Sequence, residues 1–209
     1  MENIYWDPND NPTNSTLSMD NKKSTINGDG FIKINKFFTT GKWYIEFINE
    51  YVQYLMFIGF VRKSFNKNQS FGSSWVPGSG RNYGGYDDRF GIMVAPNQYY
   101  PGAYSILNSQ YTNLGDTPKT PNNQIIGILW DIENSHLEYR INNNYLIDFN
   151  YPIEFKNEEM YFGFGGHVSN RGIIRTNKNE FSYSIPEGYY QLDPNLSITS
   201  INYSIISEE

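Results

Sequence analysis

Three well-separated segments of this sequence have the pattern of β-strands joined by turns, and the first two contain stretches in which apolar and polar residues alternate with the period of two typical of strands. They are GKWYIEF at 41–47, IIGILWDIENSHLEYRINNNYLI at 125–147, and FSYSIPEGYYQL at 181–192. The first places Trp43, Ile45 and Phe47 on one face of a strand. The second reads as strand, turn, strand, turn, strand, with Asn residues at positions where tight hairpins require positive φ. This pattern predicts an all-β chain.

The composition fits one β-rich domain. The chain has 209 residues, including 18 Tyr, 14 Phe and 18 Gly, which is enough for a two-sheet core punctuated by turns. No apolar run approaches the roughly 20 residues of a membrane span. With no cysteine, disulfides and thiolate metal sites are excluded. The start, MENIYWDPND, lacks the basic and apolar regions of a signal peptide, so we expect synthesis in a cytoplasm without export.

The charge argues against nucleic acid as a partner. The net charge is −6 and the isoelectric point about 5.0. The longest basic run at the amino-terminal end, Lys22-Lys23, is too short to track a phosphate backbone.

Two long polar connections separate the expected strands. Strands are predicted over the ranges 31–38, 42–48, 54–61, 89–95, 160–165, 172–175 and 181–183, in addition to the central meander. The segment 54–61 (YLMFIGFV) is apolar on both faces, which indicates a central strand covered on both sides. The glycine-rich connection 62–85 and the Tyr/Asn-rich connection 96–123 are too long for ordinary turns. Connections of this length are more often functional or mobile than mere linkers.

The segments at 41–47, 125–147 and 181–192 resemble the SPRY (B30.2-like) domain family. Its members open on a G-K-x-Y-x-E strand, carry a G-x-x-x-D-x-x-x-x-x-L hairpin, and close on an F-x-Y-x-x-P-x-G-F/Y corner; each pattern is present here. The resemblance implies a two-sheet antiparallel β-sandwich of the concanavalin-like jelly-roll type. It also implies binding through loops at one end of the sandwich, without catalysis. The resemblance further implies that Asp131 of this chain caps the hairpin turn.

The resemblance divides the chain into three parts. Residues 1–30 form a lead-in strand that packs on the sandwich, 31–192 the SPRY-like sandwich, and 193–209 a tail. The lead-in W-x-P-x-D, from Trp6, and the later Leu17-Ser18 resemble bacterial and phage SPRY proteins, including phage tail-fibre and baseplate components. The tail contains SITSINYSII, either a further strand or a segment that docks on a neighbour.

No set of residues with catalytic or metal-binding spacing stands out. The two histidines, His136 and His167, are thirty-one positions apart and lack metal-ligand spacing. A jelly-roll glycoside hydrolase is the serious enzymatic alternative, but Trp130-Asp131-Ile132-Glu133 lacks the E-x-D-x-x-E pattern that would place paired carboxylates in a cleft. We therefore expect no enzyme, no cofactor and no resident metal. Asp87-Asp88, with Asn82, could offer oxygen ligands to calcium, but no calcium-loop motif surrounds them.

The aromatic and amide side chains of the two long connections are the best candidates for binding. Tyr, Trp, Arg and Asn on loops held by a rigid scaffold offer large contact area at low entropy cost. The predicted ligand-binding residues are Trp75, Arg81, Asn82, Tyr83, Tyr86, Tyr99, Tyr100 and Tyr104. They are chosen on composition, because the family's loops vary.

Three kinds of function remain open. The first is a receptor-binding or carbohydrate-binding module that recognises a host-surface glycan or protein through these loops. The second is a structural subunit of a particle that binds other virion proteins or further copies of itself. The third is an intracellular adaptor that captures a short peptide. The phage-like lead-in favours a virion surface component that combines the first two, without membrane insertion.

Overall fold

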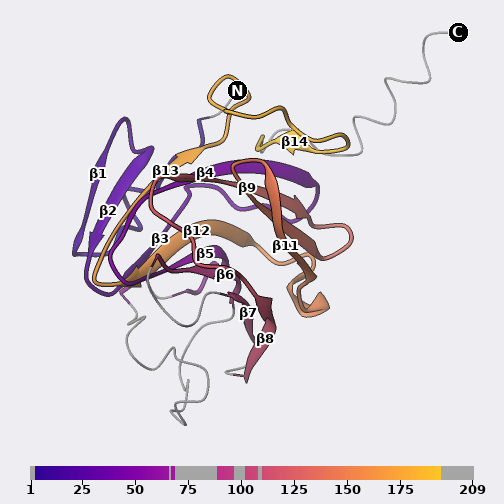
Figure 1. Ribbon diagram of the computed structural model, residues 1–209, viewed down its shortest axis with the longest axis horizontal. Helices are drawn as coiled ribbons and strands as arrows, with labels where there is room; N and C mark the ends of the chain where they lie inside the picture. Colours follow the sequence, from indigo (N-terminus) through magenta and orange to yellow (C-terminus); the bar gives the residue numbers. More distant parts are fainter. Residues whose placement is uncertain (1–2, 66, 69–88, 97–101, 108–109, 194–209) are drawn as a thin grey trace, which may run out of the picture.

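The protein is a sandwich of two antiparallel β-sheets (Figure 1). The computed structural model describes residues 3–65, 67–68, 89–96, 102–107 and 110–193. The eight-stranded sheet has the order β1-β2-β13-β4-β9-β10-β11, with β14 parallel to the start of β4. The six-stranded sheet has the order β3-β12-β5-β6-β7-β8.

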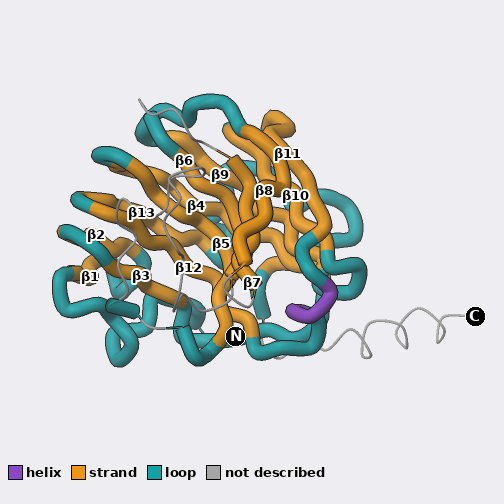
Figure 2. The backbone as a smooth tube through the Cα atoms, turned by 90° about the horizontal axis from the view of Figure 1, so that it is seen from below, coloured by secondary structure: helices purple, strands orange, loops and turns teal. Residues whose placement is uncertain are grey.

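The strands of the eight-stranded sheet are β1 (Ser15–Ser18), β2 (Lys23–Asn27), β4 (Lys42–Val52), β9 (Gln124–Asp131), β10 (His136–Ile141), β11 (Asn144–Asn150), β13 (Ser169–Arg175) and β14 (Tyr190–Gln191). Those of the six-stranded sheet are β3 (Gly30–Lys33), β5 (Leu55–Arg62), β6 (Arg89–Val94), β7 (Gly102–Leu107), β8 (Gln110–Asp116) and β12 (Met160–His167). One 3-10 turn, Ile153–Phe155, precedes β12 and lies beyond the β10–β11 side of the molecule (Figure 2).

The alternation seen in the sequence places the core between the sheets. Trp43, Ile45 and Phe47 of β4 all point into it, as expected from their shared face. Trp6, from the lead-in segment, is also fully buried there, with ring centroids 5.2 Å from Phe164 and 6.3 Å from Phe47. The lead-in therefore supplies part of the core.

Tight turns join the central meander as the Asn-rich sequence predicts. Asn142 and Asn143 have φ of 49° and 65°, the left-handed region that Asn tolerates well. Asp131 accepts a hydrogen bond from the backbone N–H of Asn134 at 3.1 Å. The expected capping role of Asp131 is confirmed.

Part of the connection 96–123, expected to be loop throughout, is a hairpin. β7 and β8 lie within it and extend the six-stranded sheet. Their sequences, GAYSIL and QYTNLGD, mix polar residues and glycine, so the alternation that marks a strand is weak.

Candidate functional site

Seven of the eight predicted ligand-binding residues lie outside the described residues: Trp75, Arg81, Asn82, Tyr83, Tyr86, Tyr99 and Tyr100. The eighth, Tyr104, belongs to β7, where its backbone pairs with Gly91 and Asn113. The choice of these residues stays a prediction. The strands that flank them are described, and they determine where each connection begins and returns.

The two connections start from opposite ends of β6. Val61 and Arg89 are register partners, so the chain between β5 and β6 leaves and returns at that end. Met93 pairs with Gly102, so the chain between β6 and β7 leaves at the other end, and the two connections do not start from one end of the sandwich as the resemblance implied. β6 has 6 residues, which separates the two ends by roughly 17 Å at the usual rise per residue.

A second apolar layer covers the outer face of the six-stranded sheet, the face turned away from the core. It contains Phe31, Leu55, Phe57, Val61, Phe65, Met93 and Ala95, all buried. Arg89 is fully buried beside it, with its guanidinium carbon 5.7 Å from the ring centre of Phe57 and 5.5 Å from that of Phe65. A cation above aromatic faces is attracted by their quadrupoles. The first connection therefore returns onto a rigid base of rings and one arginine.

Three glycines in direct register allow this layer to sit close to the sheet. Gly163, Gly59 and Gly91 are partners across β12, β5 and β6. A Cβ at Gly163 would overlap the Phe31 ring, and one at Gly59 would lie 2.8 Å from the tip of Phe57. The glycines thus make room for the two rings, and a side chain at either position would displace a ring or a neighbouring strand.

Ion pairs close the β3 edge of this face. Lys33, with its side chain 9 % exposed, lies 2.6 Å from Asp10 and 4.8 Å from the ring centre of Tyr161. Lys67 approaches the other Asp10 oxygen at 3.3 Å. Burial alone would raise the pKa of Asp10, but the two ammonium groups outweigh it and lower that pKa. These charges are already paired within the protein.

On the eight-stranded sheet, a buried carboxylate holds the closing segment of the chain. Glu46 is fully buried on the outer face, and accepts hydrogen bonds from the backbone N–H of Ser182 at 2.8 Å and of Tyr183 at 2.9 Å. Arg175 and the Tyr44 hydroxyl donate at 3.3 Å and 3.2 Å. The prediction of a strand at 181–183 is therefore wrong. The N–H groups of Ser182 and Tyr183 donate to the side chain of Glu46, and they do not pair with a neighbouring strand.

Two further acidic groups, Asp131 and Asp148, are also engaged in structural contacts. Asp131 pairs with Lys42 at 2.8 Å as well as capping its turn. His136 begins β10, with its Nε2 3.1 Å from an Asp148 oxygen. Within the described ranges no three His, Cys, Asp or Glu side chains gather in a way that could hold a metal ion. Asn82, Asp87 and Asp88, the calcium candidates, lie outside them.

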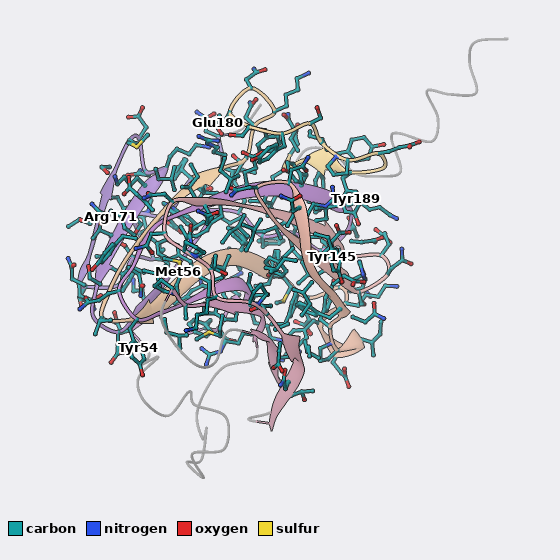
Figure 3. The ribbon with its side chains drawn as sticks, in the orientation of Figure 1. Tyr54, Met56, Tyr145, Arg171, Glu180 and Tyr189 are labelled. Atoms are coloured by element: carbon teal, nitrogen blue, oxygen red, sulfur yellow. The ribbon has the colours of Figure 1, made fainter. Side chains whose placement is uncertain are left out.

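A hollow that the sequence does not indicate opens beside β13 and β14. It has a volume of about 1210 Å³ and is bordered by the turn between β1 and β2, the segment after β13, and the end of the described chain. Lys22 and Glu180 both line it and form an ion pair at 3.3 Å, and Figure 3 shows Glu180 above the eight-stranded sheet. Residues 3–5, Ile48 and Ile173 also line it, so segments far apart in sequence form this hollow.

Comparison with solved structures finds the same architecture in several proteins. The PSpry domain of TRIM65 matches with a TM-score of 0.59 and 12% identity over 84% of this chain and 93% of that one. The fold is SPRY-like. Stonustoxin matches with a TM-score of 0.55 and 17% identity, over 82% of this chain and 27% of the toxin chain.

A carbohydrate-binding module shares the fold at lower similarity. CBM66 from Bacillus subtilis matches with a TM-score of 0.50 and 11% identity, over 82% of this chain and 91% of that one. No family model and no curated protein matches the sequence. No helix among the described residues is long and apolar enough to cross a bilayer. At these identities the likeness concerns the fold.

Proposed function

We propose that this protein is a non-catalytic binding module that recognises a glycan or a protein through the two connections flanking β6. The main support is the part of the six-stranded sheet to which the two ends of the first connection are attached. Val61 and Arg89, its two ends, are register partners on a sheet buried on both faces. A rigid scaffold beneath aromatic and amide side chains favours binding, because few scaffold motions need to be frozen.

The likeness in fold supports the same conclusion. One similar structure is a carbohydrate-binding module by its own description, and the SPRY resemblance implies binding through loops. The buried acidic groups support a non-catalytic role. Glu46 and Asp131 have their oxygens occupied by hydrogen bonds and ion pairs, whereas a glycosidase needs two carboxylates free to face the substrate.

We place the ligand contacts on the predicted residues, in two groups. Trp75, Tyr83 and Tyr86 belong to the connection before β6, and Tyr99 and Tyr100 to the connection after it. Because the connections leave from opposite ends of β6, the two groups are tested separately. Arg81, Asn82 and Tyr104 complete the proposed site.

The test is binding of the full chain to a panel of bacterial cell-wall and capsular glycans and to host-surface proteins. The Trp75/Tyr83/Tyr86 triple alanine variant and the Tyr99/Tyr100 double alanine variant run alongside. The matched control is Tyr145→Ala, which removes a tyrosine that is 65% exposed on β11. We expect the triple variant to lose binding and the control to keep it. If the triple variant, the double variant and the control all bind as strongly as the unaltered chain, this location of the site is refuted.

We further propose that the module works on the surface of a virion, as the phage-like lead-in suggests. A role in assembly with other virion proteins is the alternative. A particle component is expected to form a closed oligomer, which light scattering of the purified protein would detect. A monomer at high protein concentration would argue against the virion setting without affecting the glycan test.

A further inference from the structure

A row of isoleucines crosses the outer face of the eight-stranded sheet. Ile173, Ile48 and Ile125 are register partners on β13, β4 and β9, and each is only half-buried. At the usual spacing between strands the row is about 10 Å long. It forms an apolar strip on the face that points away from the core.

Charged rows on both sides of the strip are closed by internal ion pairs. On one side Glu50 lies 2.6 Å from Lys23 and 3.0 Å from Arg171. On the other side Arg175 lies 3.3 Å from Glu46. These charges already have partners, so the strip between them suits an uncharged, apolar segment better than a charged one.

Two of the three isoleucines of the strip form the floor of the hollow described above. Ile48 and Ile173 both line it, together with Met19, which is 60% exposed on the rim. Met has a flexible, polarizable side chain that adapts to an apolar partner. The hollow therefore combines an aliphatic floor with one adaptable apolar side chain on an otherwise polar rim, and Tyr5 is the one aromatic residue among the described residues that line it.

The described chain ends beside this hollow. Gln191 and Leu192 line it, and Leu192 is anchored in the core at 4% exposure. The sequence that follows, PNLSITSINYSIISEE at 194–209, carries no charge before Glu208. Ile201, Tyr203 and Ile205 alternate with polar residues, the pattern of a strand with one apolar face.

We propose that residues 194–209 dock on the isoleucine strip of their own chain. Ile201 is eight residues beyond Asp193, so the chain between them spans at most about 26 to 29 Å. As a flexible linker it would have an end-to-end distance of roughly 14 to 17 Å. A tether of this length gives an effective concentration in the millimolar range, which allows a weak apolar contact to be populated. Docking would cover the isoleucine strip and prevent apolar contacts between it and other protein chains.

Cross-linking in the full chain tests this directly, because the protein has no cysteine of its own. One variant carries Met19→Cys with Ser200→Cys, which places one thiol on the rim of the hollow and the other in the segment. The control carries Ile153→Cys with Ser200→Cys. Ile153 matches Met19 in exposure, at 62% against 60%, and belongs to the 3-10 turn, on the opposite side of the sandwich from the β1–β2 turn (Figure 2).

A short bis-maleimide should link the Met19→Cys pair within one chain at least about tenfold faster than the control pair, given the higher local concentration. Adding Ile201→Ser and Tyr203→Ser should reduce that rate to the control level. Equal cross-linking rates for the two cysteine pairs would overturn the proposal. A cross-linking rate for the Met19→Cys pair that the serine substitutions leave unchanged would also overturn it. A product that links two chains would also overturn it, because the occupant would then be a second copy. Glycan binding by the serine variant separates this result from the proposed function.

Discussion

The carboxylate of Glu46 should contribute more to stability than any other acidic group whose contacts are described above. Its two oxygens accept from two backbone N–H groups, Arg175 and Tyr44. In Glu46→Gln the new amide group turns donors toward the N–H of Ser182 and the guanidinium of Arg175. Leaving one partner of a buried charged network unsatisfied costs about 3 to 5 kcal/mol, a large part of the 5 to 15 kcal/mol typical of a folded domain.

Urea unfolding measures this loss against a matched control. Glu50 lies on the same strand, but its side chain is 26% exposed, with Lys23 at 2.6 Å. Such a pair is worth no more than about 1 kcal/mol. With a slope near 3 kcal/mol per molar urea, Glu46→Gln should lower the midpoint by about 1 M or more, and Glu50→Gln by about a third of that.

The anchoring role also has a local consequence. Amide exchange at Ser182 and Tyr183 should speed up in Glu46→Gln, because one side-chain oxygen then remains to accept from N–H groups that two oxygens serve in Glu46. Exchange at the same two amides should not change in Glu50→Gln. Equal destabilisation by the two substitutions, or unaltered exchange at Ser182, would refute the view that Glu46 holds the closing segment.

Three further outcomes are expected. Burial alone would raise the pKa of Asp131, but Lys42 and the Asn134 hydrogen bonds lower it. The stability that the ionised Asp131 contributes is present above the ordinary pKa of the carboxyl and is lost as pH falls through its lowered pKa in the folded protein. The loss of stability below about pH 4 should therefore be smaller in Lys42→Met. Gly59→Ala should cost about 1 to 3 kcal/mol by overpacking, because its Cβ would overlap the carbonyl of Phe90; an unaltered melting temperature would contradict this. Trp6→Ala should cost about 3 to 5 kcal/mol, measured by thermal unfolding, and a cost near zero would show that the lead-in does not belong to the core.

The strands with strong alternation were predictable from the sequence because their signal is local. In β4 every second residue faces the core, so Trp43, Ile45 and Phe47 identify the buried face. The Asn-rich turns and the cap at Asp131 are equally local, since they depend on residues within a few positions. The β7–β8 hairpin was missed because its residues carry too little apolar alternation.

Features that depend on pairing between distant strands could not be predicted. The glycine row brings Gly59 and Gly163 into register although 104 positions separate them. Glu46 meets Ser182 at a separation of 136 residues. The hollow likewise joins Lys22 to Glu180. The sequence contains all of these residues, but only the folded chain brings them together.

The hollow also indicates how the two ends of the described chain are oriented in the module. Ile4 and Leu192, near the two ends of the described chain, both line it, and the N-terminus and β14 lie on the same side in Figure 1. The described chain therefore begins and ends on that side. The six-stranded sheet, from which the two proposed recognition connections leave, lies across the core from the hollow, so both ends of the described chain are turned away from that sheet.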